Sequence, residues 1–319
     1  MVSVLAASSM AVALTFSVGA GASSTRRSSP PVSRLSGVVD PSGASMHRCA
    51  LTIKIDNTPQ AHPQSGIDQA DLIYEEIVEG QITRLAAVFN SHVPPKVGPV
   101  RSVRRTDASI VWQFGGVFTY SGGAAYAINT IKTAPVVRID QSNAAGAMYR
   151  DPSRFAPHNL YAVPSRLFAR CGRPVPPPSI LSYRTKYESL QGKQVGVFTV
   201  GFHAGYAVRY HWDPRTQSWD RDIFSAPDYT TTHVRLSPKN VIVMWIKYQG
   251  GVGNIGAQGV LYGTGRAWIF ENGRVIAGQW SRWLKAHPIV FRNGAGQVIK
   301  VNPGQTWFEL LNVGDAVTF

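Results

Sequence analysis

The chain has 319 residues, of which 44% are hydrophobic and only 16% are charged, so its composition excludes an intrinsically disordered protein. Its 32 Lys and Arg against 18 Asp and Glu give a formal net charge of +14. That charge suits an anionic partner such as nucleic acid, anionic lipid or an acidic wall polymer, and it does not choose among them.

Residues 1–22 predict a secretory signal peptide. The run "VSVLAASSMAVALTFSVGAGASS" is apolar, rich in small side chains, and contains an A-x-A cleavage pattern at Ala20, Gly21 and Ala22. An uncleaved membrane anchor is the alternative, because the run is long enough to span a bilayer. We therefore expect a secreted or cell-envelope associated, extracytoplasmic protein with no transmembrane span after signal cleavage and no nucleic-acid partner.

Residues 23–49 are expected to form a flexible linker, because Ser, Pro, Gly and Arg dominate them without an apolar period. Cys49 and Cys171 are the two cysteines of the chain. Export would place them in an oxidising environment, so a disulfide between them and two free buried thiols are both open alternatives.

Residues 50–172 predict an N-terminal mixed α+β domain. "LTIKIDN" alternates like a strand, "RRTDASIVWQF" has helical spacing, "VFTYSGG" returns to strand and "VPSRLFARC" is helical again. Asp107 or Thr106 suits the N-terminal cap of the first helix.

Within this domain, "QADLIYEEIVEGQITRLAAVF" predicts an acidic β-hairpin that reverses at a two-residue loop, Gly80-Gln81. In that register Arg84 lies opposite Ile77 on one face of the hairpin. Its guanidinium would then reach Glu75 and Glu79.

The candidate site combines these residues with an arginine-rich segment, "VGPVRSVRRTD", and with the loop "APHNLY". Carboxylates, a hydroxyl and an imidazole suffice for general acid/base chemistry if they converge in space, and arginines hold carboxylate or phosphate groups in bidentate pairs. The alternative is a buried ionic network without a substrate. The candidate catalytic residues are Asp71, Glu75 and His158, and the candidate ligand-binding residues are Glu79, Thr83, Arg84, Arg101, Ser102, Arg104 and Asn159.

No metal site is predicted, because the carboxylates lack partner histidines at diagnostic spacing. No cofactor is predicted either, since the chain has no P-loop and no GxGxxG between a strand and a helix.

Residues 173–179 contain four prolines and predict an extended connector between domains. Residues 180–319 then predict a mostly antiparallel β C-terminal domain, a small barrel or sandwich. Segments such as "NVIVMWIKY" and "GRAWIFENGRVIAGQW" alternate apolar and polar residues around turn sequences.

Several stretches in a fixed order resemble the YerB-like lipoprotein family, a two-domain bacterial envelope family of unknown function. They are "IDNTPQAHPQSGIDQADLIYEEIVEGQITRLAAVF", "GPVRSVRRTD", "YSGG", "PHNLY", "GTGRAWIFENGRVIAGQW" and "PGQTW", between Ile53 and Trp307. The resemblance implies an envelope location and a two-domain layout, and no activity. The chain departs from the family at Cys49, which is not preceded by a lipobox, and at Tyr120, where the family usually has histidine.

Two functional hypotheses follow. The first is a secreted envelope protein that binds an anionic wall polymer or peptidoglycan, with another envelope protein as a further potential partner. The second is a glycan- or phosphodiester-directed hydrolase or transferase that uses Asp71 or Glu75 together with Arg84 and Arg101. The sequence leaves open whether the protein is an enzyme.

Overall fold

One 12-stranded sheet organises the chain in this computed structural model, which describes all residues except 2–29 and 186. The expected signal peptide therefore lies outside the described residues. The strand order is β18-β17-β16-β14-β20-β2-β3-β1-β4-β5, with β15 paired to β14 and β9 paired to β17. These strands are β1 (Leu51–Asp56), β2 (Leu72–Ile77), β3 (Thr83–Phe89), β4 (Val117–Thr119), β5 (Val137–Ile139), β9 (Lys193–Gln194), β14 (Asn240–Gln249), β15 (Gln258–Val260), β16 (Gly263–Glu271), β17 (Arg274–Arg282), β18 (Val290–Asn293) and β20 (Thr306–Asn312).

The sheet joins the two halves of the chain. Strand β20, near the C-terminus, pairs in parallel with β2 of the acidic hairpin on one side and with β14 on the other. Between the halves, the Pro-rich segment 173–179 has neither helix nor strand. The halves therefore share backbone hydrogen bonds in addition to a packed surface.

A second, five-stranded sheet, in the order β13-β12-β11-β10-β21, packs on the first. The rings of Phe198 on β10 and Phe270 on β16 stack with their centroids 3.6 Å apart. Its strands are β10 (Val197–Gly201), β11 (Ala207–Asp213), β12 (Ser218–Ile223), β13 (Ala226–Pro227) and β21 (Val317–Thr318). Two short pairs complete the strands, β6 (Met148–Arg150) with β7 (Leu160–Ala162) and β8 (Ser182–Tyr183) with β19 (Lys300–Val301).

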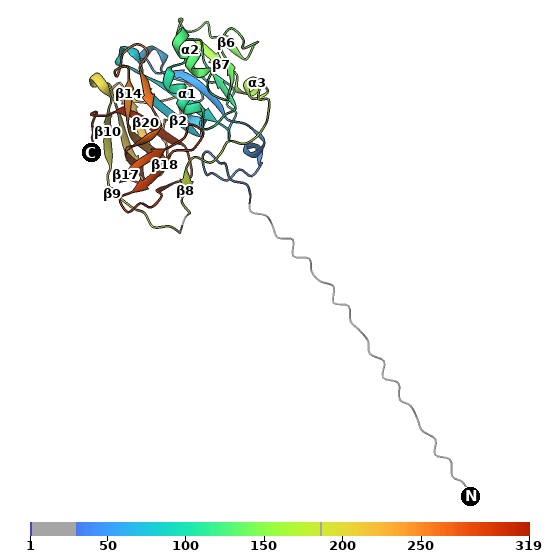
Figure 1. Cartoon of the computed structure of the whole chain (residues 1–319), viewed down its shortest axis with the longest axis vertical. Helices are drawn as coiled ribbons and strands as arrows, with labels where there is room; N and C mark the ends of the chain where they lie inside the picture. The colour runs from blue at the N-terminus through green and yellow to red at the C-terminus, as the bar shows by residue number, and fades with distance from the viewer. Residues whose placement is uncertain (2–29, 186) are drawn as a thin grey trace.

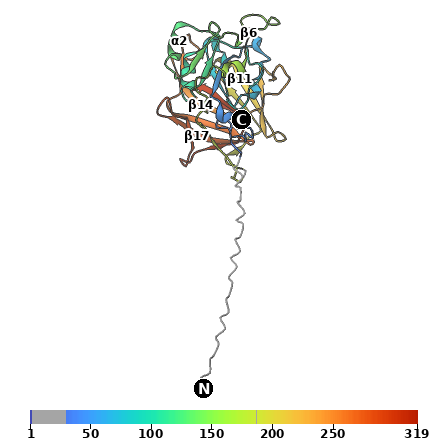
Figure 2. The same cartoon turned by 90° about the vertical axis from the view of Figure 1, so that its right-hand side faces the viewer.

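Helices are few and short among the described residues, so the protein is mostly β. Figure 1 shows them at one end of the molecule, away from β17 and β18, and Figure 2 shows the same separation for α2 and β17. The α-helices are α1 (Arg105–Val111), α2 (Ala125–Ile131) and α3 (Pro164–Phe168), and the 3-10 turns are Ala44–His47, Pro59–Ala61, Ile67–Gln69, Glu79–Gln81 and His203–Gly205. Helices α1 and α3 confirm the two helical segments predicted above. In the part of the chain that is described, no helix has the length and apolarity to cross a bilayer.

The acidic hairpin is present, but the predicted register is wrong by one residue. Arg84 lies opposite Glu76, because five residues, 78–82, separate the paired strands where two were expected. A backbone hydrogen bond of 2.9 Å from the Val78 N–H to the Ile82 carbonyl closes this loop. Since side chains alternate along a strand, the one-residue shift places Glu75 on the opposite face from Arg84.

Residues 23–49 were expected to be flexible; residues 23–29 lie outside the described residues, and for residues 30–49 the expectation is wrong. Leu35 is fully buried in the main core, and a Cβ on Gly37 would overlap the ring of Tyr183, so the segment packs closely on the second half. The sequence did not reveal this order, because loop contacts and backbone hydrogen bonds hold the segment in place, and such interactions leave no apolar period in a sequence. The segment ends at Cys49, which forms a disulfide with Cys171 across 122 residues of chain.

Candidate functional site

A buried ion cluster lies on the helix-covered face of the hairpin. The ammonium group of Lys54 on β1 contacts Glu76 on β2 and lies 2.9 Å from Asp107 Oδ1 on α1. Asp107 Oδ2 also accepts a 2.6 Å hydrogen bond from the Arg104 N–H at the helix start, so Asp107 caps the helix from its third position, while the N-cap residue is Arg104 and neither Asp107 nor Thr106. Burial raises the pKa of Asp107 to about 6, because one ammonium cannot fully neutralise two buried carboxylates.

A second ion cluster lies on the opposite face and is centred on Glu75. Its Oε2 atom lies 2.7 Å from the guanidinium of Arg221 on β12, which also contacts Asp228. Its Oε1 atom accepts hydrogen bonds from Thr83 at 2.6 Å and from Asn57 at 3.1 Å. Glu75 and Arg221 are fully buried, so each depends on the other for compensation of its charge.

Glu309 extends this cluster from the neighbouring strand. It lies directly beside Glu75 in the parallel pairing of β20 with β2, and it accepts a hydrogen bond from the Tyr210 hydroxyl. Burial raises the pKa of Glu309 well above its usual range, and the negative charge of Glu75 raises it further. Glu309 therefore holds a proton while Glu75 forms the ion pair. We call Glu75, Arg221, Asp228, Glu309 and Tyr210 the Glu75 network.

The hairpin tip carries a third, more accessible group. The Glu79 side chain is 32% exposed and pairs with Arg104, at 2.6 Å from Arg104 Nε, and more loosely with Arg84 at 3.7 Å. Arg84 also donates to the Ser102 carbonyl at 3.1 Å. Burial, with the nearby positive charge of Arg101, lowers the pKa of Arg84 to about 10. The tip thus unites four of the predicted ligand-binding residues, and Glu79 is their carboxylate.

Asp56, at the end of β1, gathers two further predicted residues. Its Oδ2 atom lies 2.8 Å from His158 Nδ1 and 3.1 Å from Arg101 Nε. The Thr58 hydroxyl lies 3.2 Å from the same histidine nitrogen. Asp56 is fully buried, whereas the side chains of His158 and Arg101 are 19% and 23% exposed. A buried carboxylate that orients a partly exposed imidazole is an arrangement used in general acid/base catalysis. We call these four residues the Asp56 site.

Two predicted residues hold loops in place. Asp71 accepts hydrogen bonds from the Asn90 and Ser91 N–H groups, at 2.7 and 2.9 Å, and so fixes the chain after β3. Asn159 accepts from Arg150 at 2.7 Å and donates to the backbone of the 151–159 loop. Both side chains are therefore occupied by hydrogen bonds to the protein itself.

The predicted residues therefore divide into separate groups. Arg84 and Arg101 are electrostatic neighbours, and Arg101 and His158 share Asp56, but Glu75 and Asp71 face elsewhere. Sequence reasoning missed the buried partners Lys54, Arg221 and Glu309. Lys54 offered a signal, because a lysine within "LTIKID" puts a charge in a strand that is buried on both faces.

Metal binding has no support in the described residues, since no three His, Cys, Asp or Glu side chains are grouped to hold an ion there. Two hollows, of about 540 and 590 Å³, are lined by residues other than the predicted site residues.

Comparison with known proteins identifies the family of this chain. Residues 35–173 match the family described as "Protein of unknown function (DUF3048) N-terminal domain", and residues 198–308 match its C-terminal domain. The chain belongs to the DUF3048 family. The matched ranges cover the Glu75 network, the Asp56 site and the hairpin tip, apart from Glu309, which follows the second range by one residue.

This DUF3048 protein is similar to a Bacillus subtilis (strain 168) protein named "Putative lipoprotein YerB", with 33% identity over 115 residues, which are 36% of this chain. That match spans 35% of the relative's length. The crystal structure of YerB from Bacillus subtilis is similar over 91% of this chain and all of that chain, with a TM-score of 0.78 and 22% identity. The expected family resemblance is thereby confirmed, and the shared fold includes both halves.

Proposed function

We propose that this DUF3048 protein is an extracytoplasmic envelope protein that binds an anionic wall polymer or peptidoglycan. The name of the YerB relative supports an envelope location. The Cys49–Cys171 disulfide supports an oxidising compartment. The observation that carries the binding function is the distribution of charge between the interior and the surface.

Folding buries more acidic than basic side chains. Among the described residues, eight Asp and Glu are buried against only four Lys and Arg. The exposed surface is consequently more cationic than the net charge of the chain suggests. The buried carboxylates of the hairpin thus stabilise the fold, and the arginines on the surface are available to bind a polyanion. The buried acids are Asp56, Asp71, Glu75, Glu76, Asp107, Asp228, Glu271 and Glu309, and the buried cations are Lys54, Arg84, Arg221 and Arg282.

One group of arginines lies together beside the disulfide. The Arg170 guanidinium donates to the Asn143 backbone carbonyl, and the Asn143 side chain donates to the Arg138 backbone carbonyl, both at 3.3 Å, so the two residues border the same loop. Arg138 and Arg173 line a shallow hollow of about 590 Å³ together with Cys171. We use the name arginine face for four residues, Arg138, Arg166, Arg170 and Arg173.

The guanidinium charges of the arginine face are available to a ligand. In the residues that the structure describes, none of its four guanidiniums forms an ion pair with a carboxylate. Three of them, Arg166, Arg170 and Arg173, are exposed. Neighbouring guanidiniums of this kind bind phosphate and carboxylate groups in bidentate pairs, which favours a polymer that repeats such groups.

The test is binding to purified cell wall, and to polyphosphate as a soluble polyanion, across a salt series. We expect the double variant Arg170→Gln/Arg173→Gln to bind roughly tenfold more weakly than the unmodified protein, because two charge-assisted contacts are lost. Arg34→Gln/Arg209→Gln removes the same charge at exposed positions elsewhere on the surface and is the matched control. Binding that persists in high salt, or no binding to either material, would overturn the polyanion function. Equal losses in both variants would overturn the arginine face as its location.

The Asp56 site favours a second candidate, hydrolysis or transfer at a glycan or phosphodiester. His158 would serve as the acid/base, and Arg101 would hold negative charge on the substrate. Release of soluble fragments from purified peptidoglycan, and cleavage of bis(nitrophenyl) phosphate, test this candidate. Turnover that is lost in His158→Gln at an unchanged melting temperature would support it, and turnover absent from the unmodified protein would refute it.

A further inference from the structure

A gap opens in the long sheet between β14 and β16. The two strands pair from Asn240–Met244 to Ala267–Glu271 and then separate. Beyond Met244, β14 pairs with β15, while β16 continues along β17 to Gly263. The β16 edge that faces β14 therefore carries no strand from Gly263 to Arg266 among the described residues.

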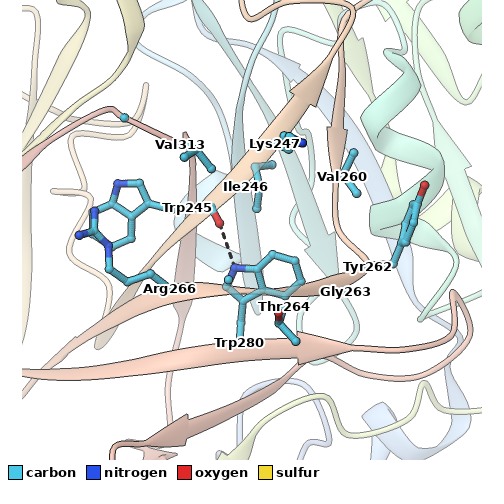
Figure 3. Close-up of a pocket in the computed structure, with 12 residues that line it drawn as sticks. Trp245, Ile246, Lys247, Val260, Tyr262, Gly263, Thr264, Arg266, Trp280 and Val313 are labelled. Atoms are coloured by element: carbon cyan, nitrogen blue, oxygen red, sulfur yellow. Dashed lines mark hydrogen bonds between the residues drawn. The ribbon is translucent and has the colours of Figure 1, made fainter.

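Aromatic side chains line this gap without filling it. The Trp280 indole enters from β17 and donates a 3.0 Å hydrogen bond to the Trp245 carbonyl, as Figure 3 shows. A Cβ on Gly265 would lie 2.5 Å from Trp280 Nε1, so glycine is required for the indole to sit there. The space that remains is a hollow of about 540 Å³, with Tyr262 and Val260 on the side opposite Arg266 in Figure 3. We call it the strand-gap hollow.

Two cations stand at the strand-gap hollow. Lys247 and Arg266 line it and are exposed, and within the described chain neither forms an ion pair. The described residues that line it include no Asp or Glu. The Arg266 guanidinium lies 3.7 Å from the centre of the Trp245 ring, and the Trp245 indole is itself held by a 2.7 Å hydrogen bond to the Asp315 carbonyl. Arg266 is therefore orientated by stacking before any ligand arrives.

We propose that the strand-gap hollow binds a small organic anion, a carboxylate or phosphate attached to a flat apolar body. The anionic group would lie between Lys247 and Arg266, which have no other charge to compensate. The flat body would lie against the exposed ring of Tyr262, because aromatic rings offer large apolar faces for stacking. Ligand pockets generally have volumes of about 300 to 1,000 Å³ and largely apolar linings with a few polar groups, and this hollow has that size and a lining that includes Lys247 and Arg266.

This inference is independent of the polymer-binding proposal. The hollow is lined by residues 245–314, whereas the arginine face comprises residues 138–173. The two sites share no residue, so one can fail without the other.

The test uses naphthyl phosphate and naphthoate as anionic probes and naphthalenemethanol as the neutral probe. Titration is followed by calorimetry and by the indole N–H resonances of Trp245 and Trp280. We expect both anions to bind roughly tenfold or more tightly than the neutral probe and to shift these resonances. Comparison of the two anions shows which anionic group the hollow prefers.

Lys247→Gln/Arg266→Gln should reduce anion affinity to about that of the neutral probe, with little change in melting temperature because both side chains are exposed. Thr264→Trp, at an exposed lining position, should block all three probes. Arg34→Gln/Arg209→Gln, at exposed positions outside both sites, should leave their binding unchanged. The proposal is overturned if the anions show no binding at millimolar concentration, bind no better than the neutral probe, or lose affinity equally in both double variants.

Discussion

Replacing Glu75 by Gln tests whether the acid of the hairpin is structural. The substitution keeps the shape of the side chain but removes the charge 2.7 Å from Arg221, which is fully buried. It also puts an amide donor where the network supplies donors, from Arg221 on one side and from Thr83 and Asn57 on the other. Either orientation of the amide leaves a buried group without an acceptor.

Breaking a buried ion pair by removing one partner costs about 3–5 kcal/mol. Here we expect the lower end, about 3 kcal/mol, because Asp228 remains in contact with Arg221 and Glu309 can give up its proton once Glu75 is neutral. For a chain of this length the melting temperature should fall by about 6 °C, at roughly 2 °C per kcal/mol.

The assay is denaturant unfolding at pH 7, followed by tryptophan fluorescence and circular dichroism. Glu79→Gln is the matched control, because the same change at the partly exposed hairpin tip should cost less than about 1 kcal/mol. A loss below about 1 kcal/mol in Glu75→Gln, with an unchanged denaturant slope, would refute the structural role. If polymer binding or turnover disappeared in that stable variant, Glu75 would be a functional residue.

Three further predictions follow from the buried groups. Glu309→Gln should change the free energy of unfolding by less than about 1 kcal/mol at pH 7, because the raised pKa keeps Glu309 protonated and Gln mimics the protonated form. Urea unfolding measures this change, and a loss as large as that of Glu75→Gln would contradict a protonated Glu309. The folded-state pKa of Asp107, about 6, lies above its unfolded value, so protonation of Asp107 stabilises the fold. This contribution to the free energy of unfolding is fully present below about pH 4 and is lost as the pH rises through about 6. Asp107→Asn should flatten that decline in unfolding free energy, and an equally steep decline in the variant would assign it to another group. Reduction with dithiothreitol, or Cys171→Ser, should lower the unfolding free energy by about 2–5 kcal/mol, and identical denaturation midpoints with and without reductant would refute this.

The hairpin illustrates what local pattern can and cannot define. Alternation of apolar and polar residues identified both strands, but the loop length set the register, and Gly80 permits more than one turn. The observed loop has positive φ at Gly80 and also at Gln81, which is unusual for a residue with a side chain. The loop of five residues, where two were expected, shifted the register and separated Glu75 from Arg84.

The partners of the acids could not be read from the sequence, because they come from distant segments. Arg221 lies 146 residues after Glu75, and Lys54 lies 53 residues before Asp107. The first pair forms only once β12 lies against β2, and the second only once α1 lies against β1. The strand-gap hollow was likewise not visible in sequence, since "NVIVMWIKY" reads as one uninterrupted strand although its partner changes after Met244.

The sequence alone determined the β-rich character, the helices at 105–111 and 164–168, the cationic balance and the family. These depend on neighbouring residues or on composition, so local pattern suffices. Only the tertiary structure decided that Cys49 and Cys171 are joined, that both halves share one sheet, and that the acids of the hairpin are buried rather than exposed. Those outcomes depend on contacts between residues far apart in the chain, and only folding brings such residues together.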